Sequence, residues 1–155
     1  PRVFLEDEGR LIGRLSLPEA LREAMAVAPM LVVEESMASR IDAVIEDYVV
    51  DLGRRFAARD GDGGPMAHCT RLLADLDRIR KRLGGERHRQ VAGLLQAAFH
   101  QEWSGGGLDG HRAWIELLLA DYYDPMYEYQ LGKRRGEMLF SGSREAVAHF
   151  ASGMN

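Results

Sequence analysis

Residues 3–21 read Val3-Phe-Leu-Glu-Asp-Glu-Gly-Arg-Leu-Ile-Gly-Arg-Leu-Ser-Leu-Pro-Glu-Ala-Leu21, and this stretch decides the expected fold. It opens with a short apolar run that ends in three carboxylates, the pattern of a buried strand whose end reaches the surface. Ser16 stands three residues before Glu19, with Pro18 between them, which predicts a helix that starts at residues 16–17 with a capping box. That helix is expected to end near Ala28, before a second apolar run at residues 30–33.

Strand, helix and strand in this order predict a βαβ unit, with residues 3–5 and 31–33 as parallel neighbours packed under the helix. Ligands of open α/β sheets bind beyond the carboxyl ends of the strands. Glu6, Asp7 and Glu8 are expected there, and in P-loop enzymes a carboxylate at this place helps to hold magnesium beside phosphates. The alternative is a solvated strand end. Because side chains alternate along a strand, the three carboxylates cannot all serve one ion.

The rest of the chain is expected to be helical. Ser36 is the expected N-cap of a helix that runs to about residue 56, and its three- and four-residue spacing predicts burial of Ile41, Ile45, Tyr48 and Leu52. Glycine-rich loops are expected at residues 60–65 and 105–107, and Gly84-Gly85 predicts a tight turn between antiparallel helices. Asp124-Pro125 predicts the start of a new helix. The further helices are expected over residues 66–83, 86–103, 110–122, 124–140 and 143–150.

These elements predict a mostly helical α/β chain, with a partial P-loop-type parallel sheet of two strands in one βαβ unit, followed by a helical C-terminal region. We expect one compact unit, in which residues 1–59 are the βαβ-α part of a P-loop-like domain and residues 60–155 are the helical region. Two parallel strands alone make a poor sheet, so upstream strands or another chain are expected to complete it. The chain begins at Pro1, midway through a motif, and we expect it to be a piece of a longer protein.

The composition is that of a soluble globular protein, with 46% hydrophobic and 28% charged residues and a net charge of −4. Charge is unevenly distributed: residues 1–51 carry 5 basic and 11 acidic side chains, and residues 52–155 carry 15 and 13. A single cysteine rules out an internal disulfide and suits a reducing cytoplasm. No apolar run approaches the roughly 18 residues of a membrane span, so a cytoplasmic protein without membrane association is expected.

Cys69 invites a nucleophile hypothesis because His68 precedes it. Adjacent residues on a helix point about 100° apart, so the two rarely form a catalytic pair, and Cys69 is interpreted as structural. The five histidines show no metal-ligand spacing and no nucleophile elbow is present. We therefore assign no catalytic residue in this chain.

A basic segment surrounds the glycine pair, with seven cationic residues: Arg71, Arg78, Arg80, Lys81, Arg82, Arg87 and Arg89. Basic side chains at a helix–Gly-Gly–helix corner suit a curved phosphate backbone, whereas the alternative is a solvated face. The tyrosines of residues 122–127 either stack on bases or pack the last helices together. The candidate RNA-binding residues are Arg71, Arg78, Arg82, Arg87 and Arg89.

The order of motifs resembles the bacterial tRNA 2-selenouridine synthase family. The shared features are the apolar strand with Glu-Asp-Glu, Arg10, Ile12-Gly13, the Leu-Pro-Glu-Ala-Leu helix, Pro29-Met-Leu-Val-Val-Glu-Glu35, Arg40, Asp47-Tyr48, Arg82-Leu-Gly-Gly85 and Tyr122-Tyr-Asp-Pro-Met-Tyr127. The resemblance covers the C-terminal part of the family. It implies that a rhodanese-like domain with its cysteine and a glycine-rich phosphate loop precede Pro1, and that Glu6, Asp7, Glu8, Arg10 and Arg40 belong to a phosphate or metal site.

The resemblance further implies an enzyme that replaces sulfur by selenium in the wobble 2-thiouridine of tRNA, through a geranylated intermediate. Selenophosphate and geranyl diphosphate would be its substrates and tRNA its partner, with a magnesium ion as a candidate cofactor. We expect no cofactor on the 155-residue chain alone and no turnover by it. Two alternatives stay open: a non-catalytic helical RNA-binding module, and a fragment of a small P-loop kinase. A Walker A motif and a rhodanese-type cysteine in the full-length gene would favour the synthase.

Overall fold

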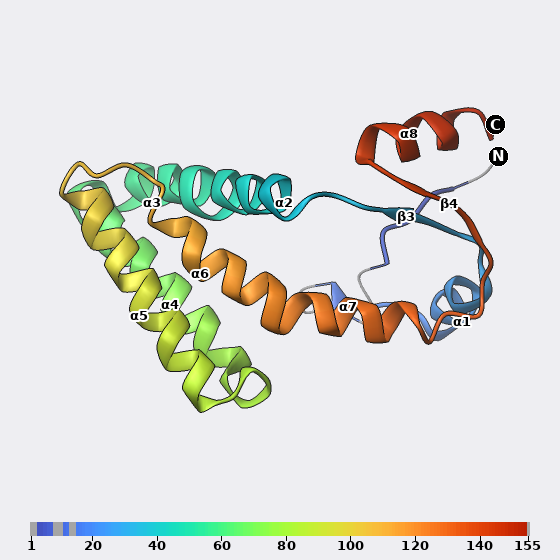
Figure 1. Ribbon diagram of the computed structural model, residues 1–155, viewed down its shortest axis with the longest axis horizontal. Coiled ribbons are helices and arrows are strands. Elements are labelled where there is room, and N and C mark those ends of the chain that lie inside the picture. The colour runs from blue at the N-terminus through green and yellow to red at the C-terminus, as the bar shows by residue number, and fades with distance from the viewer. Residues whose placement is uncertain (1–2, 8–10, 13–14, 155) are drawn as a thin grey trace. The chain divides into compact units, whose positions relative to one another are not determined.

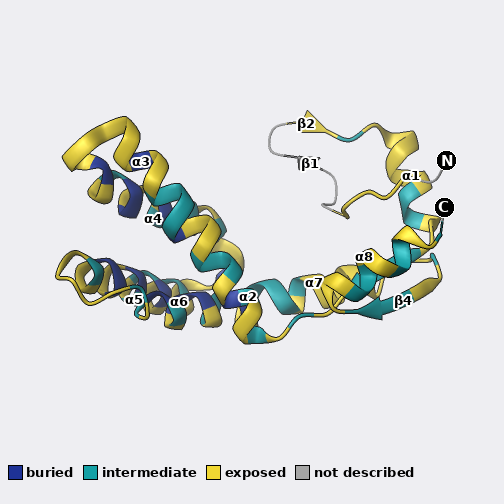
Figure 2. Cartoon of the chain, turned by 90° about the horizontal axis from the view of Figure 1, so that it is seen from above, coloured by how far each residue is buried: buried dark blue, intermediate teal, exposed yellow. Residues whose placement is uncertain are grey.

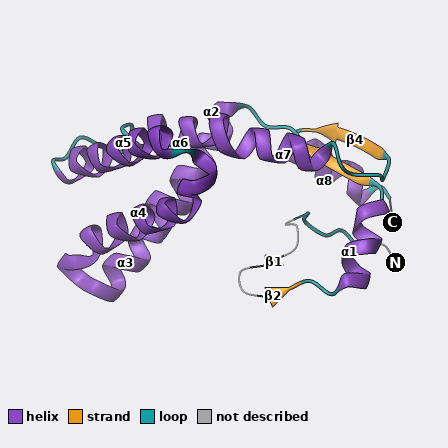
Figure 3. Ribbon diagram, turned by 90° about the horizontal axis from the view of Figure 1, so that it is seen from below, coloured by secondary structure: helices purple, strands orange, loops and turns teal. Residues whose placement is uncertain are grey.

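A computed structural model describes residues 3–7, 11–12 and 15–154 of the chain. The chain divides into two compact units, which we name by their content. The sheet unit consists of residues Pro1–Glu35 and Tyr129–Asn155, and the helical unit consists of Ser36–Glu128. Most described residues are helical and the parallel sheet has two strands (Figure 3), so the predicted mostly helical α/β class is confirmed.

The parallel sheet joins β3 (Met30–Val33) to β4 (Met138–Gly142), with Leu31 opposite Phe140 and Val33 opposite Gly142. The helix α8 (Arg144–Ser152) packs on these strands (Figure 1) and begins as predicted, because Ser143 Oγ accepts a hydrogen bond from the Ala146 N–H at 3.3 Å. A two-stranded parallel sheet was predicted, but its second strand comes from the end of the chain.

The predicted strand at residues 3–5 is wrong. Residues 3–7 form no strand, and the side chains of Val3, Phe4 and Leu5 are 78%, 50% and 57% exposed. Three apolar residues before three carboxylates offer little area to bury, whereas β4 supplies five residues that end in small side chains. The helix predicted to reach residue 140 ends at Leu131 instead. Gly136 then passes so close to the Ala28 carbonyl that no side chain fits there.

The first helix, α1 (Glu19–Val27), ends where expected but begins differently. Ser16 lies in β2 (Leu15–Ser16), which pairs antiparallel with β1 (Leu11–Ile12), so it is not available as the cap. Pro18 occupies the N-cap position instead, with φ of −53° and no side-chain cap. The fixed φ of proline starts this helix without a capping box.

In the helical unit, α2 (Met37–Val44) continues through a π-helix, η1 (Ile45–Asp51), into α3 (Leu52–Asp60). The predicted cap is confirmed: Ser36 Oγ accepts from the Ser39 N–H at 3.1 Å. Ile41 is buried as predicted, but Tyr48 is 53% exposed, and Val49 is buried in its place. A π-helix carries more residues per turn than an α-helix, so the inward face moves forward by one residue. The prediction for Tyr48 failed because it assumed uninterrupted α-helical spacing.

The next helices are α4 (Gly64–Leu83) and α5 (Gly85–Trp103), an antiparallel pair, as predicted (Figure 1). The loop expected at residues 60–65 is reduced to a 3₁₀ turn, η2 (Gly61–Gly63). The helix α6 (His111–Leu118) runs through a second π-helix, η3 (Leu119–Tyr123), into α7 (Asp124–Leu131). Asp124-Pro125 therefore does not start a new helix. A proline ring clashes with the carbonyl four residues earlier, and the wider π-turn immediately before Pro125 relieves that clash.

The core of the helical unit lies between the facing sides of α3, α4, α5 and α6, where the buried residues gather (Figure 2). Two buried histidines stand in it. His68 lies 3% exposed on α4, and its Nε2–H donates to the Tyr48 carbonyl at 2.7 Å. His111 is fully buried; its Nδ1 accepts from Trp114 Nε1–H at 3.1 Å, so its proton lies on Nε2 and is donated to Glu102 at 3.0 Å. The core is thus tied together by polar bonds as well as by apolar area.

The packing of α3 against α4 depends on Gly64. A Cβ at Gly64 would lie 2.7 Å from Ala57 Cα, closer than real Cβ contacts. We expect Gly64→Ala to lower the free energy of unfolding by about 1–3 kcal/mol. Gly63→Ala is the matched control, because Gly63 has φ of −79° and nothing within 4 Å of its Cβ position. Denaturant titration followed by circular dichroism measures both, and equal losses would show that the close approach does not limit packing.

The buried histidines predict that stability falls at mildly acidic pH. Burial lowers the pKa of both His68 and His111 below that of a free histidine. The unfolded chain then binds more protons than the folded chain near and below pH 6.5, so the free energy of unfolding decreases as pH falls from 7.5 to 5.0. Protonated His111 would also turn Nδ1 into a donor that faces the Trp114 N–H.

Denaturant titrations at pH 7.5 and 5.0 measure this loss. Ordinary carboxylates titrate below this pH range, so they contribute little to the difference. His111→Gln should lose part of the pH dependence, whereas His100→Gln, at an exposed position of α5, should keep all of it. An unchanged pH dependence in His111→Gln would contradict the assignment.

Candidate nucleic-acid interface

The basic corner of the helical unit is built by one glycine. α4 ends at Leu83, and Gly84, with φ of +88°, turns the chain into α5. This backbone conformation is open to glycine and strained for other residues. The Gly84 N–H closes the last turn of α4 by donating to the Arg80 carbonyl at 3.0 Å. Arg80, Lys81 and Arg82 occupy that last turn, where cations are favoured by the helix dipole.

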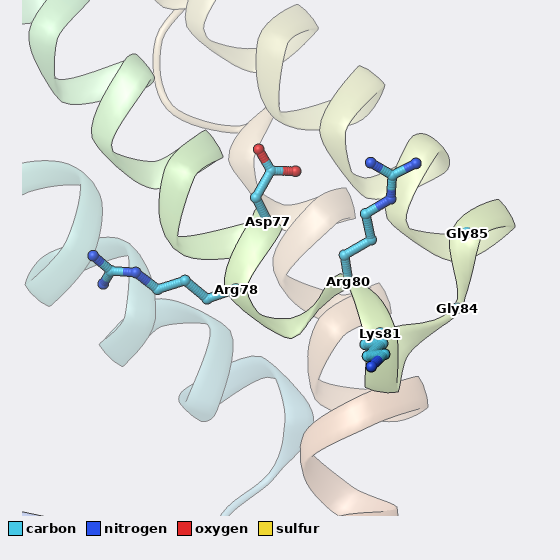
Figure 4. Close-up of a pocket in the computed structure, with 6 residues that line it drawn as sticks. All are labelled: Asp77, Arg78, Arg80, Lys81, Gly84 and Gly85. Atoms are coloured by element: carbon cyan, nitrogen blue, oxygen red, sulfur yellow. The ribbon is translucent and has the colours of Figure 1, made fainter.

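A concavity of about 520 Å³ lies at this corner, and its lining consists of Asp77, Arg78, Arg80, Lys81, Gly84 and Gly85. Figure 4 shows that the charged side chains do not converge on one point: Arg80 and Asp77 are directed to one side of α4 and Arg78 to another. Asp77, the acidic group of the lining, also has a neighbour, because its Oδ1 lies 2.7 Å from His88 Nε2, without the alignment of a hydrogen bond. Cations that spread over an exposed corner suit an extended polyanion better than a small ligand.

The structure separates the candidate arginines into two groups. Three of them are held in ion pairs: Arg71 with Asp75 at 2.7 Å, Arg78 with the same Asp75 at 2.6 Å, and Arg87 with Asp121 at 2.6 Å. Within the described part of the chain, no ion pair involves the other four basic residues of the segment: Arg80, Lys81, Arg82 and Arg89. None of these four cations is held by a carboxylate, although two of them, Arg80 and Lys81, line the concavity together with Asp77.

The phosphate- and metal-site candidates belong to both units. In the sheet unit, Glu6 and Asp7 are exposed, and Arg134 Nε donates to Asp7 Oδ2 at 2.7 Å. Glu8 and Arg10 lie outside the described residues. The role of these residues in a phosphate or metal site stays a prediction. Among the described residues, no group of three or more histidine, cysteine, aspartate or glutamate side chains is arranged to hold a metal ion.

Arg40 lies in the first turn of α2, in the helical unit, and its guanidinium forms a two-point ion pair with Asp124. Both side chains are about two-thirds buried, and the hydrogen bond that Arg40 donates to Asp124 raises the pKa of Arg40. Asp124, expected as a helix cap, thus serves as the partner of Arg40. A guanidinium has five N–H donors, so this pairing leaves donors for a phosphate.

Cys69 is buried at 6% exposure in α4, and burial raises the pKa of its thiol above the ordinary value. A thiol that stays protonated is a poor nucleophile. The structural interpretation of Cys69 agrees with this environment. The polar core contacts of its neighbour His68 had no sequence signal, because their partners come from distant helices. No helix in the described part of the chain is both long and apolar enough to cross a bilayer.

Comparison with known proteins gives a consistent result. The sequence model of a family described as "tRNA 2-selenouridine synthase AAA domain" matches residues 1–155. The tRNA 2-selenouridine synthase of Marinobacter nauticus is 47% identical over 150 residues, which are 96% of this chain and 41% of that protein. Proteins of the same name from Pseudomonas fluorescens strain Pf0-1 and Alcanivorax borkumensis are each 44% identical over 149 residues. The chain therefore spans about two fifths of the length of these relatives. No solved structure matches it.

The burial of Cys69 predicts slow thiol chemistry in the folded chain. Labelling with a disulfide reagent such as 5,5′-dithiobis(2-nitrobenzoate) should be at least about a hundredfold slower in buffer than in guanidinium, because access requires local opening of a packed helix. Absorbance of the released thiolate measures the rate, and Cys69→Ala provides the blank. Equal rates in the two solvents would show an accessible thiol and reopen the nucleophile hypothesis.

Proposed function

This chain belongs to the tRNA 2-selenouridine synthase family, and from that premise we propose that it is the tRNA-contacting part of an enzyme that replaces sulfur by selenium in wobble 2-thiouridine. The relatives are longer than this chain, and the proposal assigns the rhodanese-like cysteine and the phosphate loop to the remainder of such a protein. The reaction uses selenophosphate and passes through a geranylated intermediate formed from geranyl diphosphate. The protein works in the cytoplasm, where tRNA is modified.

The observation that carries the proposal for this chain is the group of four cations without ion pairs at the α4–Gly84–α5 corner: Arg80, Lys81, Arg82 and Arg89. A phosphate backbone that meets such cations releases its condensed counterions, and this release drives binding. The paired arginines Arg71, Arg78 and Arg87 contribute less, because a phosphate must compete with a carboxylate that already holds each guanidinium. The corner is therefore the phosphate-contacting surface, with Arg82 and Arg89 retained from the sequence prediction.

The acidic residues and Arg40 take a secondary place in the proposal. Arg40, oriented by Asp124, has N–H donors left for a phosphate group of a substrate. The described carboxylates do not make a complete magnesium site, since Asp7 is paired with Arg134 and no cluster of three potential ligands is present among the described residues. No step of the proposed reaction is assigned to a metal in this chain.

A second candidate function is a helical RNA-binding module without catalysis, and the same corner supports it. The full-length gene distinguishes the two, because a Walker A motif and a rhodanese-type cysteine accompany the synthase alone. A third reading, a fragment of a small P-loop kinase, gains no support from the corner, because a kinase of small substrates needs no extended basic surface.

The proposal predicts a salt-dependent affinity for tRNA. Changing Arg80, Lys81 and Arg82 together to Ala should weaken binding of an unmodified tRNA transcript and flatten the plot of log affinity against log salt by about 2–3 units, near 0.9 for each lost phosphate contact. Fluorescence anisotropy of labelled transcript at a series of salt concentrations measures the slope.

The matched control changes three arginines of the same unit that already have carboxylate partners, namely Arg54, Arg59 and Arg112. It removes the same charge and should leave the slope nearly unchanged. Circular dichroism confirms that each variant is folded. Equal slopes in the wild type and the corner variant would place the phosphate contacts elsewhere.

A further inference from the structure

Four tyrosines gather around the two π-helices of the helical unit; we call Tyr48, Tyr122, Tyr123 and Tyr127 the tyrosine cluster. Tyr122 and Tyr123 meet edge to face with ring centroids 5.0 Å apart, and Tyr123 and Tyr127 lie nearly parallel at 6.3 Å and 24°. Tyr48 and Tyr127 are 53% and 55% exposed. The cluster thus has a half-buried base and two open rings.

The members of the cluster come from different elements but lie close in space. Burial is the main cause that raises the pKa of Tyr123, and the neighbouring Tyr48, Tyr122, Tyr127 and Asp75 raise it further. The phenol of Tyr123 is therefore neutral at physiological pH and keeps its proton as a donor. The π-helix η1 is responsible for the arrangement on its side, because its extra residue buries Val49 and turns Tyr48 outward.

Positive charge borders the cluster. Asp75, whose charge helps to raise the pKa of Tyr123, is shared by Arg71 and Arg78, so two cations face one carboxylate. Tyr127 is close enough to Arg40 for the two to interact electrostatically. Asp75 also links this region to the basic corner, because its partner Arg78 lines the concavity. On α5, Arg87 reaches Asp121 in η3, immediately before the tyrosines.

We propose that the tyrosine cluster is a stacking surface for an unpaired base of the RNA whose phosphates lie on the basic corner. This inference rests on the proposed function, since it takes the same RNA as ligand. Aromatic rings beside a basic groove are the usual way in which proteins hold single-stranded nucleic acid. Bases in a duplex are stacked on each other, so only an unpaired base offers its face to Tyr48 or Tyr127.

The chemistry of the surface favours a base over an aliphatic chain or a protein partner. Each open ring carries a hydroxyl, and the ion pairs of Asp75 with Arg71 and Arg78 supply charge near the cluster. An aliphatic ligand would leave those hydroxyls and charges desolvated without hydrogen bonds, at a considerable cost. A nucleotide meets the ring with its π-face and the nearby cations with its phosphate, which is the complementary arrangement.

The test uses the 155-residue chain with two probes, an oligouridylate of about ten nucleotides, within the site sizes of roughly 4–16 nucleotides, and a duplex of equal length. The double variant Tyr48→Leu/Tyr127→Leu keeps apolar bulk and removes the π-faces. Its affinity for oligouridylate should fall about five- to hundredfold, whereas its affinity for the duplex and its salt slope should stay unchanged. Tyr48→Phe/Tyr127→Phe should bind as the wild type does.

Tyr129→Leu is the matched control, because Tyr129 lies on the same helix and is 65% exposed, and it should bind as the wild type does. The proposal is overturned if the leucine double variant binds oligouridylate normally while the Arg80, Lys81 and Arg82 variant still flattens the salt slope. That result leaves the proposed function standing. A loss shared with Tyr129→Leu, or an equal loss for the duplex, also overturns it. An unaltered slope in the corner variant marks failure of the proposed function itself.

Discussion

The hydrogen bond that His68 Nε2–H donates to the Tyr48 carbonyl constrains both the core of the helical unit and the surface outside it. It joins α4 to the π-helix η1, whose geometry departs from the α-helices on either side. The ring of His68 also stacks on Phe56 at 5.5 Å and meets the edge of Phe99 at 5.0 Å, so one side chain contacts three helices. In the π-helix, Val49 is buried in the core and Tyr48 lies outside it. The hydrogen bond to the Tyr48 carbonyl therefore helps to fix both the apolar core and the aromatic surface outside it.

The second constraint is which of the basic side chains are paired with carboxylates and which are not. The helical unit holds most of the arginines of the chain, and a basic composition alone would not distinguish a binding surface from a solvated face. Asp75 holds Arg71 and Arg78 within α4, and Asp121 of η3 holds Arg87 of α5. At the end of α4 the sequence Arg80-Lys-Arg82 has no acidic residue at i−4 except Asp77, which lies beside His88. Excess charge therefore accumulates at the corner.

Local signals were sufficient for much of this fold. Ser36 caps α2 as its position predicted, a last helix forms close to the expected residues 143–150, Gly84 ends α4, and the family was identified from the order of short motifs. The errors occurred where a distant contact outweighed a local pattern. Residues 138–142 form a strand because β3 is available to pair with them, although glycine-interrupted helical spacing runs up to them. Tyr48 is exposed because it lies in a π-helix, and no local sequence pattern predicted that π-helix. Among the candidate site residues, composition found the corner, but only the distances separated paired from unpaired arginines.

The helical unit is an insertion in sequence between two paired strands, β3 and β4. Parallel strands need a crossover of a dozen or more residues, and here the crossover between adjacent strands contains the whole helical unit, Ser36–Glu128. The entropy cost of closing so long a connection grows only logarithmically with its length, so an insertion of this size is tolerated provided that it folds by itself. Its core meets that condition, because every buried residue of the hydrophobic cluster, from Ile41 to Leu119, lies between the two strands in sequence. The sheet unit, in contrast, has no fully buried side chain among its described residues. A binding surface on a self-sufficient insertion can therefore change its side chains without disturbing the strands that hold it.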